Sequence, residues 1–344
     1  MKILVNDIAA SGGGALSILQ DFYSYIKDND KNNQWIFLLS NPFINETQRI
    51  KVKVIKKAKA SWKNRFLFDL YAWKKVVNEY QPDVILSLQN TIFCFCDYPQ
   101  IVYIHQPLPF QQIKKFSLFN SKERKFWFYQ NIIGMFIKYS ARHANKVIVQ
   151  TNWMKSQVER YSKKNQTYKI PPNLIPYNFS KEVDWKCNKF IYPTSQAIYK
   201  NNECLYTACD LLVERKLQFV TEVTLESNEN RKNVKFIGKI PRDILMEKYS
   251  QYTLVFPSYI ETYGLPLAEG RMCGALILAA DTEFAREILD GYANAYYFDP
   301  FKPIELFELM HKVISGEIVK QRIVENKPIE NTWGEIINLL ENIE

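Results

Sequence analysis

The sequence predicts an α/β protein built from two doubly wound lobes, each with a parallel β-sheet covered by helices. Three observations support this prediction. The length of 344 residues exceeds that of one ordinary domain. Short apolar runs rich in β-forming residues alternate with longer helical patterns in both halves of the chain. A proline-rich stretch, Ile170–Pro176, separates the halves and marks the expected linker, so we place the lobes at 1–172 and 173–328.

The first half reads as strands separated by helices. The helices are expected near Ala15–Tyr25, Phe66–Glu79 and Ser121–Ser140. The expected strands are Lys2–Asn6, Trp35–Ser40, Val52–Ile55, Val84–Ser87, Ile101–Ile104 and Val147–Gln150.

The second half repeats the alternation. The expected strands are Phe190–Tyr192, Phe219–Leu225, Val234–Ile237, Leu254–Phe256, Ala275–Ala279 and Ala295–Phe298. The expected helices are Asn202–Leu212, Asp243–Tyr249, Pro266–Met272, Ile304–Ile314 and Trp333–Ile343. Ligands of such folds bind beyond the carboxyl ends of the strands, so the loops that enter helices are the places to search for a site.

Composition narrows the class of protein. No apolar run reaches the 18–20 residues or so that span a bilayer, and the N-terminal strand runs into an acid and glycines, unlike a secretory leader. The six cysteines form no C-x-x-C pair and lack zinc-ligand spacing with the three histidines. We therefore expect reduced thiols in a cytoplasmic protein.

Charge is divided unevenly between the halves. Residues 1–175 carry 26 Lys and Arg against 11 Asp and Glu, whereas residues 176–344 carry 19 against 25. A basic first lobe indicates an anionic partner such as nucleic acid, an anionic membrane or a phosphate-bearing substrate.

A glycine-rich loop, Gly12, Gly13 and Gly14, lies between the first strand and the first helix. Glycines there allow a ligand to approach the backbone, and the helix N-terminus favours a diphosphate. A plain tight turn is the alternative. The dinucleotide fingerprint G-x-G-x-x-G lacks its third glycine, since position 17 is Ser17, and no acid ends the second strand, which argues against an NAD-dependent dehydrogenase.

The strongest pattern runs from Val255 to Glu269. A strand ends near Phe256, a loop carries Glu261, and Pro266 suits the first turn of a helix that carries Glu269. Backbone N–H groups around Tyr263–Leu265 are then available for phosphate oxygens. Two carboxylates flanking a phosphate site suit a ligand with hydroxyls on both sides of a diphosphate, such as a nucleotide sugar. A solvated loop acid and a helix-start acid are the alternative.

This segment resembles the E-x7-E signature of retaining GT-B glycosyltransferases, family 4 (glycosyl transferases group 1). The resemblance extends from Gly12 to about Phe298, and it implies two Rossmann-like lobes facing each other across a cleft. It also implies that Glu261 holds hydroxyls of the transferred sugar and Glu269 those of the ribose. The amides of Tyr263, Gly264 and Leu265 would contact the sugar and phosphates. The helix in 329–344 would pack back on the first lobe.

Further residues match the family pattern in the second lobe. Lys200 occupies the place of the phosphate-binding lysine, where it would neutralise charge that develops on the leaving β-phosphate. A surface lysine at a helix start is the alternative. The segment with Gly238 and Ile240 resembles the one whose backbone contacts the nucleobase. Many family members carry an arginine after the preceding strand, but this chain has Ser195 and Gln196, so no second cation is assigned.

His105 ends a strand in the first lobe and resembles the histidine that reaches the donor sugar in this family. A buried structural histidine is the alternative. The run from His105 to Phe110 further resembles bacterial capsular and cell-surface polysaccharide enzymes, with rhamnosyltransferases nearest. The donor would then be dTDP-rhamnose or another dTDP- or UDP-sugar. Asp28-Asn29-Asp30 spells the D-x-D of metal-dependent glycosyltransferases but reads as a solvated helix end.

Two segments rich in basic and aromatic residues, 51–80 and 114–143, are the expected contacts of the acceptor and the membrane. They carry nine and seven Lys and Arg against two and one acids, with aromatic side chains between them. Such mixing fits a helix lying on an anionic membrane, a solvated basic face or nucleic acid, although no nucleic-acid motif is present. A polyprenyl-diphosphate-linked saccharide acceptor explains both the charge and a membrane preference.

The sequence thus predicts a metal-independent, retaining glycosyltransferase that needs no cofactor besides its nucleotide-sugar substrate and acts at the inner face of the cell membrane. We assign catalytic roles to Glu261, His105 and Lys200. The rival interpretations are another GT-B enzyme, such as a nucleotide-sugar epimerase, and a non-enzymatic binder of anionic lipid or nucleic acid.

Overall fold

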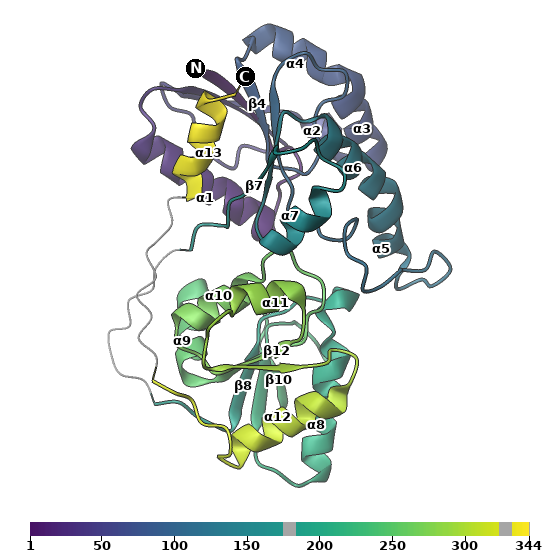
Figure 1. Ribbon diagram of the computed structural model, residues 1–344, viewed down its shortest axis with the longest axis vertical. Helices are drawn as coiled ribbons and strands as arrows, with labels where there is room; N and C mark the ends of the chain where they lie inside the picture. The colour runs from purple at the N-terminus through teal and green to yellow at the C-terminus, as the bar shows by residue number, and fades with distance from the viewer. Residues whose placement is uncertain (175–183, 323–331, 344) are drawn as a thin grey trace. The chain divides into compact units, whose positions relative to one another are not determined.

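The computed structural model describes residues 1–174, 184–322 and 332–343, and every element below lies in these ranges. The chain divides into two compact units (Figure 1). Unit 1 comprises Met1–Asn173 and Glu330–Glu344, and unit 2 comprises Leu174–Ile329. The expected linker Ile170–Pro176 lies outside the described residues from position 175 onward.

Unit 1 is built on a parallel sheet with the strand order β3-β2-β1-β4-β5-β6-β7 among its described residues. Strands β4 and β5 are buried along their whole length, as expected where helices cover both faces of a parallel sheet. The strand bounds are β1 (Lys2–Asn6), β2 (Gln34–Leu39), β3 (Ile50–Val54), β4 (Val84–Ser87), β5 (Gln100–Tyr103), β6 (Lys146–Val149) and β7 (Thr167–Lys169).

The helices of unit 1 include two that change pitch midway. A π-helical turn over Phe68–Ala72 joins α3 to α4, and a second over Tyr129–Ile133 joins α5 to α6. The sequence predicts one regular helix at each place. The helix bounds are α1 (Gly13–Asn29), α2 (Lys56–Lys59), α3 (Trp62–Leu67), α4 (Trp73–Tyr80), α5 (Arg124–Phe128), α6 (Gly134–His143), α7 (Asn152–Val158) and α13 (Thr332–Glu341).

Helix α13 packs beside α1 in unit 1 (Figure 1). The Trp333 side chain is 2% exposed, and its ring centroid lies 4.9 Å from that of Phe22. Its indole N–H donates a hydrogen bond to Asp21 Oδ2 at 2.7 Å. Ile336 and Leu340, at three- and four-residue spacing, are fully buried on the same helix face. The C-terminal helix therefore completes the core of unit 1.

Replacing the Trp333 side chain should destabilise unit 1. We expect Trp333→Ala to lower the free energy of unfolding by about 3–5 kcal/mol, because it removes a buried indole and leaves a cavity. Trp333→Phe keeps most of the volume and should lower it less. Urea unfolding followed by tryptophan fluorescence measures the change, since six of the seven tryptophans lie in unit 1. Equal unfolding midpoints for wild type and Trp333→Ala would show that α13 does not anchor this core.

Unit 2 has a parallel sheet with the order β10-β9-β8-β11-β12-β13 in the described part of the chain. Helices α8 and α12 pack together on one face, and α9, α10 and α11 cover the other (Figure 1). The strands are β8 (Lys189–Tyr192), β9 (Val220–Val223), β10 (Val234–Phe236), β11 (Thr253–Phe256), β12 (Ile277–Ala280) and β13 (Ala295–Phe298). The helices are α8 (Asn202–Glu214), α9 (Arg242–Gln251), α10 (Leu265–Met272), α11 (Glu283–Ile288) and α12 (Pro303–Ile314).

Each sheet reverses its strand order once, and this reversal sets where a ligand can bind. In unit 2 the chain runs from β8 outward to β10 and then from β11 outward to β13, so the reversal lies between β8 and β11. In unit 1 the reversal lies between β1 and β4. The loops after such a strand pair diverge to opposite faces and leave a crevice at the carboxyl end of the sheet. Both units are doubly wound α/β structures, as the sequence predicts.

Candidate functional site

Lys200 reaches the unit-2 crevice from the loop that follows β8. The segment Ile198–Lys200 forms a 3₁₀ turn, and Asn201 takes a left-handed conformation with φ of 58° before α8 begins. The Asn201 side-chain amide donates to the carbonyl oxygens of Pro257 and Pro300, at 3.3 and 2.7 Å. This residue therefore ties the β8 loop to the loops after β11 and β13.

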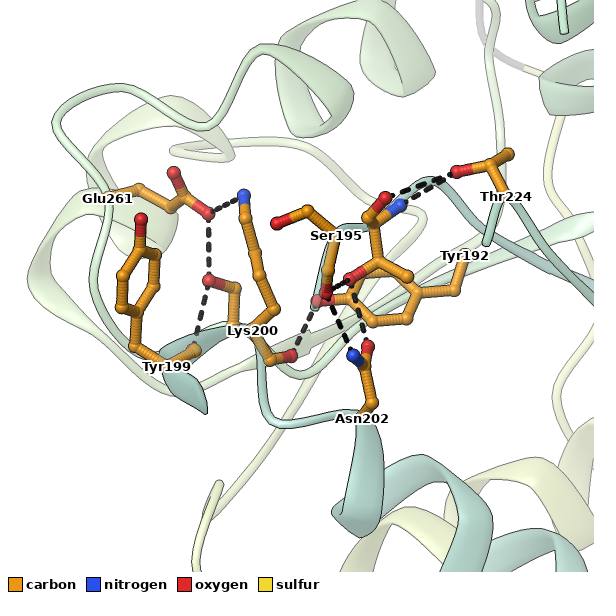
Figure 2. Close-up of polar contacts among 9 residues, drawn as sticks. Tyr192, Ser195, Tyr199, Lys200, Asn202, Thr224 and Glu261 are labelled. Atoms are coloured by element: carbon orange, nitrogen blue, oxygen red, sulfur yellow. Dashed lines mark hydrogen bonds and ion pairs between the residues drawn. The ribbon is translucent and has the colours of Figure 1, made fainter. Parts of the chain in front are cut away.

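Glu261 reaches the same crevice from the loop after β11. Its carboxylate forms an ion pair with the Lys200 ammonium through Oε1 (Figure 2). The Lys200 and Glu261 side chains are 18% and 17% exposed, so the pair is largely shielded from bulk water. The structure thus joins two of the predicted site residues directly, although they lie 61 positions apart in sequence.

Ser258 fixes the orientation of the Glu261 carboxylate. The serine is fully buried, and its Oγ lies 2.7 Å from Glu261 Oε1 and 3.3 Å from the Tyr199 carbonyl oxygen. Glu261 Oε1 therefore accepts hydrogen bonds from both Ser258 and Lys200. Within the described residues Oε2 has no hydrogen-bond or ion-pair partner, which leaves it available to accept from a ligand hydroxyl.

A second group of hydrogen bonds holds the β8 loop in shape. Thr194 donates its backbone N–H to Thr224 Oγ1 at 2.9 Å and its hydroxyl to Asn202 Oδ1 at 2.9 Å. The Tyr192 hydroxyl donates to the Lys200 carbonyl oxygen (Figure 2). These bonds fix the backbone that carries Lys200, so its ammonium is presented from a rigid base.

The N-terminus of α10 lies directly after Glu261 in sequence. Gly264 precedes the helix with φ of +83°, and a Cβ at this position would meet Leu267 and Phe284 at 3.4 Å. A side chain here would be strained, so the turn into α10 requires glycine. The first amides of a helix lack intrahelical acceptors, and the predicted Tyr263–Leu265 segment lies at this end. Its position suits an anion that approaches from the crevice.

Glu269 lies one helical turn further along α10 and has a different partner. Its Oε1 accepts from Arg242 Nε at 2.8 Å, and its side chain is 13% exposed. Burial raises the pKa of the Glu269 carboxyl, whereas the Arg242 guanidinium opposes that rise. Arg242 is therefore the cation that holds this second carboxylate in place. Glu261 and Glu269 each have a basic partner, from different strand-to-helix loops.

The predicted base-contacting segment follows β10. Gly238 has φ of +64° and donates its N–H to the Leu225 carbonyl oxygen at 3.1 Å. Ile240 is half-buried just before α9. Both therefore lie at the carboxyl end of the unit-2 sheet, as do the loops of Lys200 and Glu261.

The remaining predicted residues belong to unit 1. Gly12 is the N-cap of α1, and Gly13 and Gly14 form its first turn. A Cβ at Gly12 would have no atom within 4 Å, so this turn has open space beside it. His105 belongs to the same unit.

His105 follows β5 and is bound by Asn90. The Asn90 Oδ1 atom accepts from the His105 backbone N–H at 2.7 Å, and its Nδ2 lies 3.3 Å from the imidazole Nε2. The imidazole Nδ1 is buried and has no partner within the described residues. Burial lowers the pKa of the His105 imidazole to about 4, so the ring is neutral near pH 7.

The buried imidazole should make the fold acid-sensitive. In the unfolded chain His105 takes up a proton near its ordinary pKa of about 6.5, whereas the folded protein resists protonation until about pH 4. The contribution of the neutral His105 imidazole to the free energy of unfolding is therefore complete above pH 6.5 and is lost as the pH falls toward 4. The loss is about 2–3 kcal/mol at pH 4.5. The free energy of urea unfolding at pH 7 and pH 4.5 measures the loss.

His105→Gln should reduce this pH dependence by that amount, whereas the exposed His143, replaced by Gln, serves as the control. An unchanged pH dependence in His105→Gln would contradict a depressed imidazole pKa.

Three residues of the site are missed by sequence reasoning. Ser258, Asn201 and Arg242 act by holding the predicted residues, and no spacing rule marks a residue whose role depends on tertiary contact. The P-S-x-x-E run does contain Ser258, and its position three residues before Glu261 is the signal that could have identified it.

The D-x-D segment has a structural role. Asp30 is 8% exposed, and it accepts from the Trp35 indole at 2.8 Å and from Asn33. The expectation of a solvated helix end is wrong for Asp30, because the carboxylate is buried against Trp35. Among the described residues no group of His, Cys, Asp and Glu has the arrangement of a metal site. All six cysteines are free.

Comparison with known proteins identifies the fold. Residues 190–329 match the family model described as Glycosyl transferases group 1. No curated protein sequence matches the chain. WaaG, described as a glycosyltransferase involved in lipopolysaccharide biosynthesis, shares 12% identity with a TM-score of 0.74, over 99% of this chain and 100% of that chain.

Two further solved structures are similar. Sucrose-phosphate synthase from Thermosynechococcus elongatus has 15% identity and a TM-score of 0.66, covering 91% of this chain and 90% of that chain. Anabaena HepE, solved in complex with UDP and glucose, has 17% identity and a TM-score of 0.62, covering 92% and 90%. The predicted α/β GT-B fold with two Rossmann-like lobes is confirmed, and the match to the Glycosyl transferases group 1 model lies within unit 2.

Proposed function

We propose that this protein is a retaining glycosyltransferase of family 4 that transfers a sugar from a nucleotide diphosphate to a lipid-linked saccharide. The observation that carries the proposal is the Lys200–Glu261 pair at the strand reversal of unit 2, inside a group 1 glycosyltransferase domain. A cation and a carboxylate side by side match a ligand with phosphate oxygens next to sugar hydroxyls.

The donor diphosphate competes with Glu261 for the Lys200 ammonium in this proposal. When phosphate oxygens take over the ammonium, Glu261 is left to accept hydrogen bonds from sugar hydroxyls, and Ser258 keeps the carboxylate oriented. The amides of Tyr263, Gly264 and Leu265 add donors for the phosphates. Charge that develops on the departing β-phosphate is then stabilised by Lys200 and by these dipoles, without a metal ion. Glu269, held by Arg242, binds the ribose hydroxyls.

The donor is dTDP-rhamnose in our proposal, with a UDP-sugar as the alternative. The rhamnosyltransferase resemblance of the run from His105 to Phe110 favours the former. HepE, solved with UDP and with UDP-glucose, supports the latter. The product belongs to cell-surface or capsular polysaccharide.

The Glu261 carboxylate should make the protein bind a nucleotide sugar more tightly than the nucleotide alone. Wild type should gain thermal stability with UDP or dTDP and gain more with the corresponding sugar, since extra contacts increase affinity. Glu261→Gln should lose the increment due to the sugar, and Lys200→Met should lose affinity for both ligand types by about tenfold or more. The unfolding midpoint at matched ligand concentrations measures both effects.

Glu283→Gln, an exposed acid in the first turn of α11, is the matched control and should behave as wild type. Retention of the full sugar increment in Glu261→Gln would overturn the assignment of this residue. Turnover of the donor into an isomer without any acceptor would favour the epimerase alternative.

Unit 1 binds the acceptor and the anionic inner face of the cell membrane in our proposal, which makes the protein cytoplasmic and peripheral. No helix in the described ranges is long and apolar enough to cross a membrane. Segments 51–80 and 114–143 keep several aromatic and aliphatic side chains exposed, whereas Phe68, Trp73 and Phe116 are buried in the core. Phe119 is 93% exposed in the loop before α5, and it lies in sequence between the exposed Lys115 and Lys122. Apolar side chains beside cations suit an anionic lipid surface.

Removing the exposed ring of Phe119 should weaken membrane binding. We expect Phe119→Ser to reduce binding to vesicles of mixed anionic and zwitterionic lipid about tenfold, since the ring no longer enters the interface. Raising the salt concentration should weaken vesicle binding by both the wild type and Phe119→Ser, because salt screens the charges of the lysines. Phe301→Ser, at a 57% exposed aromatic of unit 2, is the control that should bind as wild type. Equal vesicle binding by wild type and Phe119→Ser in a sedimentation assay would rule out this contact.

A further inference from the structure

Unit 1 contains a cavity of about 780 Å³ at its own strand reversal. The loops after β1, β4 and β5 supply its polar end, and α3, α6 and the π-helical turns of both bent helices supply most of its walls. The wall side chains are mainly apolar, among them Phe66, Phe128, Ile132, Phe136 and Ile137. A cavity with apolar walls and a few polar groups is the usual form of a small-molecule site.

The buried side-chain NH₂ of Gln89, at the polar end, has no acceptor within the described residues. Gln89 is 6% exposed, and its Oε1 accepts from the Ala9 backbone N–H at 3.3 Å. Because a backbone N–H can only donate, this contact identifies the oxygen of the side-chain amide, and the other terminal atom, Nε2, is the NH₂ donor. That Nε2 has no hydrogen-bond partner within the described residues. A buried amide donor without an acceptor is unfavourable by about 1–3 kcal/mol, which a ligand oxygen would offset.

Asn90 sets which imidazole nitrogen of His105 carries the proton. The Asn90 Oδ1 accepts from a backbone N–H, which can only donate, so Nδ2 is the amide nitrogen that faces His105 Nε2. Nε2 must therefore be the acceptor, and the neutral ring carries its hydrogen on Nδ1. Nδ1 is the buried atom without a partner, and His105 lines the cavity. Asn90 is thus a positioning residue that makes His105 a hydrogen-bond donor.

The charged side chains that line the cavity are two cations, Lys63 and Arg65, and one carboxylate, Asp69. Asp69 Oδ2 accepts from Arg65 Nε at 3.2 Å and from the Thr91 hydroxyl at 3.0 Å, whereas its buried Oδ1 has no hydrogen-bond partner within the described residues. Lys63 is exposed to solvent. The site therefore offers N–H donors and a cation to the head of a ligand and a hydrocarbon surface to its body.

We propose that this cavity binds the acceptor of the transfer reaction by a single-chain isoprenyl or alkyl phosphate moiety. The chain packs on the aromatic and aliphatic walls, and head-group oxygens accept from Gln89 Nε2 and His105 Nδ1. This inference therefore assigns His105 to the acceptor and not to the donor sugar, the role that the family resemblance implies. This inference rests on the proposed function, because it assigns a binding site in unit 1 to the lipid part of the acceptor.

Farnesyl phosphate, below its critical micelle concentration, is the probe. It should bind the full chain in isothermal titration calorimetry, with inorganic phosphate not binding and farnesol binding more weakly. Ile132→Trp, which fills the cavity wall, should abolish binding, whereas Ile113→Trp, at an exposed position outside the cavity, should not. Gln89→Leu should weaken binding about tenfold.

The imidazole supplies a readout independent of activity. In a His143→Gln/His311→Gln background only His105 remains, so its ¹⁵N resonances are assigned directly. We expect the Nδ1–H tautomer before addition and a shift of the Nδ1 resonance when farnesyl phosphate binds. Asn90→Asp places a carboxylate opposite Nε2, so it should move the proton to Nε2 and weaken binding. Two results would overturn the inference. One is an Nε2–H tautomer in the His143→Gln/His311→Gln protein that retains Asn90, and the other is farnesyl phosphate binding that Ile132→Trp leaves intact.

The outcome separates this inference from the proposed function. Farnesyl phosphate binding should be unchanged in Glu261→Gln, which alters unit 2. If nucleotide sugars bind through Glu261 but farnesyl phosphate does not bind, the glycosyltransferase proposal stands and the acceptor class is wrong. If farnesyl phosphate binds as expected and no nucleotide sugar does, the cavity assignment stands and the proposed sugar-transfer reaction is wrong.

Discussion

The ion pair between Lys200 and Glu261 is the interaction on which the account of unit 2 depends. It forms only because β8 and β11 are neighbours whose following helices cover opposite faces of the sheet, so their loops meet at the carboxyl edge. Both side chains are shielded from bulk water, and such a pair needs further hydrogen bonds to hold its geometry. Ser258 and the Tyr192 hydroxyl supply those bonds, directly to the carboxylate and through the lysine backbone.

The two units share one topology but differ in the chemistry placed at the strand reversal. In unit 2 the crevice is charged, and each predicted carboxylate has a basic partner, Lys200 or Arg242. In unit 1 the corresponding place is a mostly apolar cavity whose polar end carries His105 and Gln89. The excess of cations in unit 1 does not make this cavity strongly charged, because most of those cations lie on segments 51–80 and 114–143, and among them only Lys51 and Lys53 are on a strand. The same order of strands therefore carries different side chains at its reversal in the two units.

Much of the fold follows from the sequence, because apolar runs and turn residues are local signals. The strands flanking the site, β8 and β11, are predicted within a residue or two of their bounds. Strand β7 and helices α2, α7 and α11 are not predicted, since they span only three to seven residues and carry little periodicity. The π-helical turns are also missed, because no residue pattern distinguishes such a turn from the α-helix around it. In the site, Glu261, Glu269 and Lys200 follow from a motif, whereas Arg242 and Asn90 depend on contacts between loops far apart in sequence.

The most direct test of the central claim is a crystal structure of the protein with its nucleotide-sugar donor. The account predicts that the diphosphate lies between the loops after β8 and β11, with the Lys200 ammonium on a phosphate oxygen and the Glu261 carboxylate on hydroxyls of the sugar. A donor bound elsewhere on unit 2, with the Lys200–Glu261 ion pair unchanged, would contradict it.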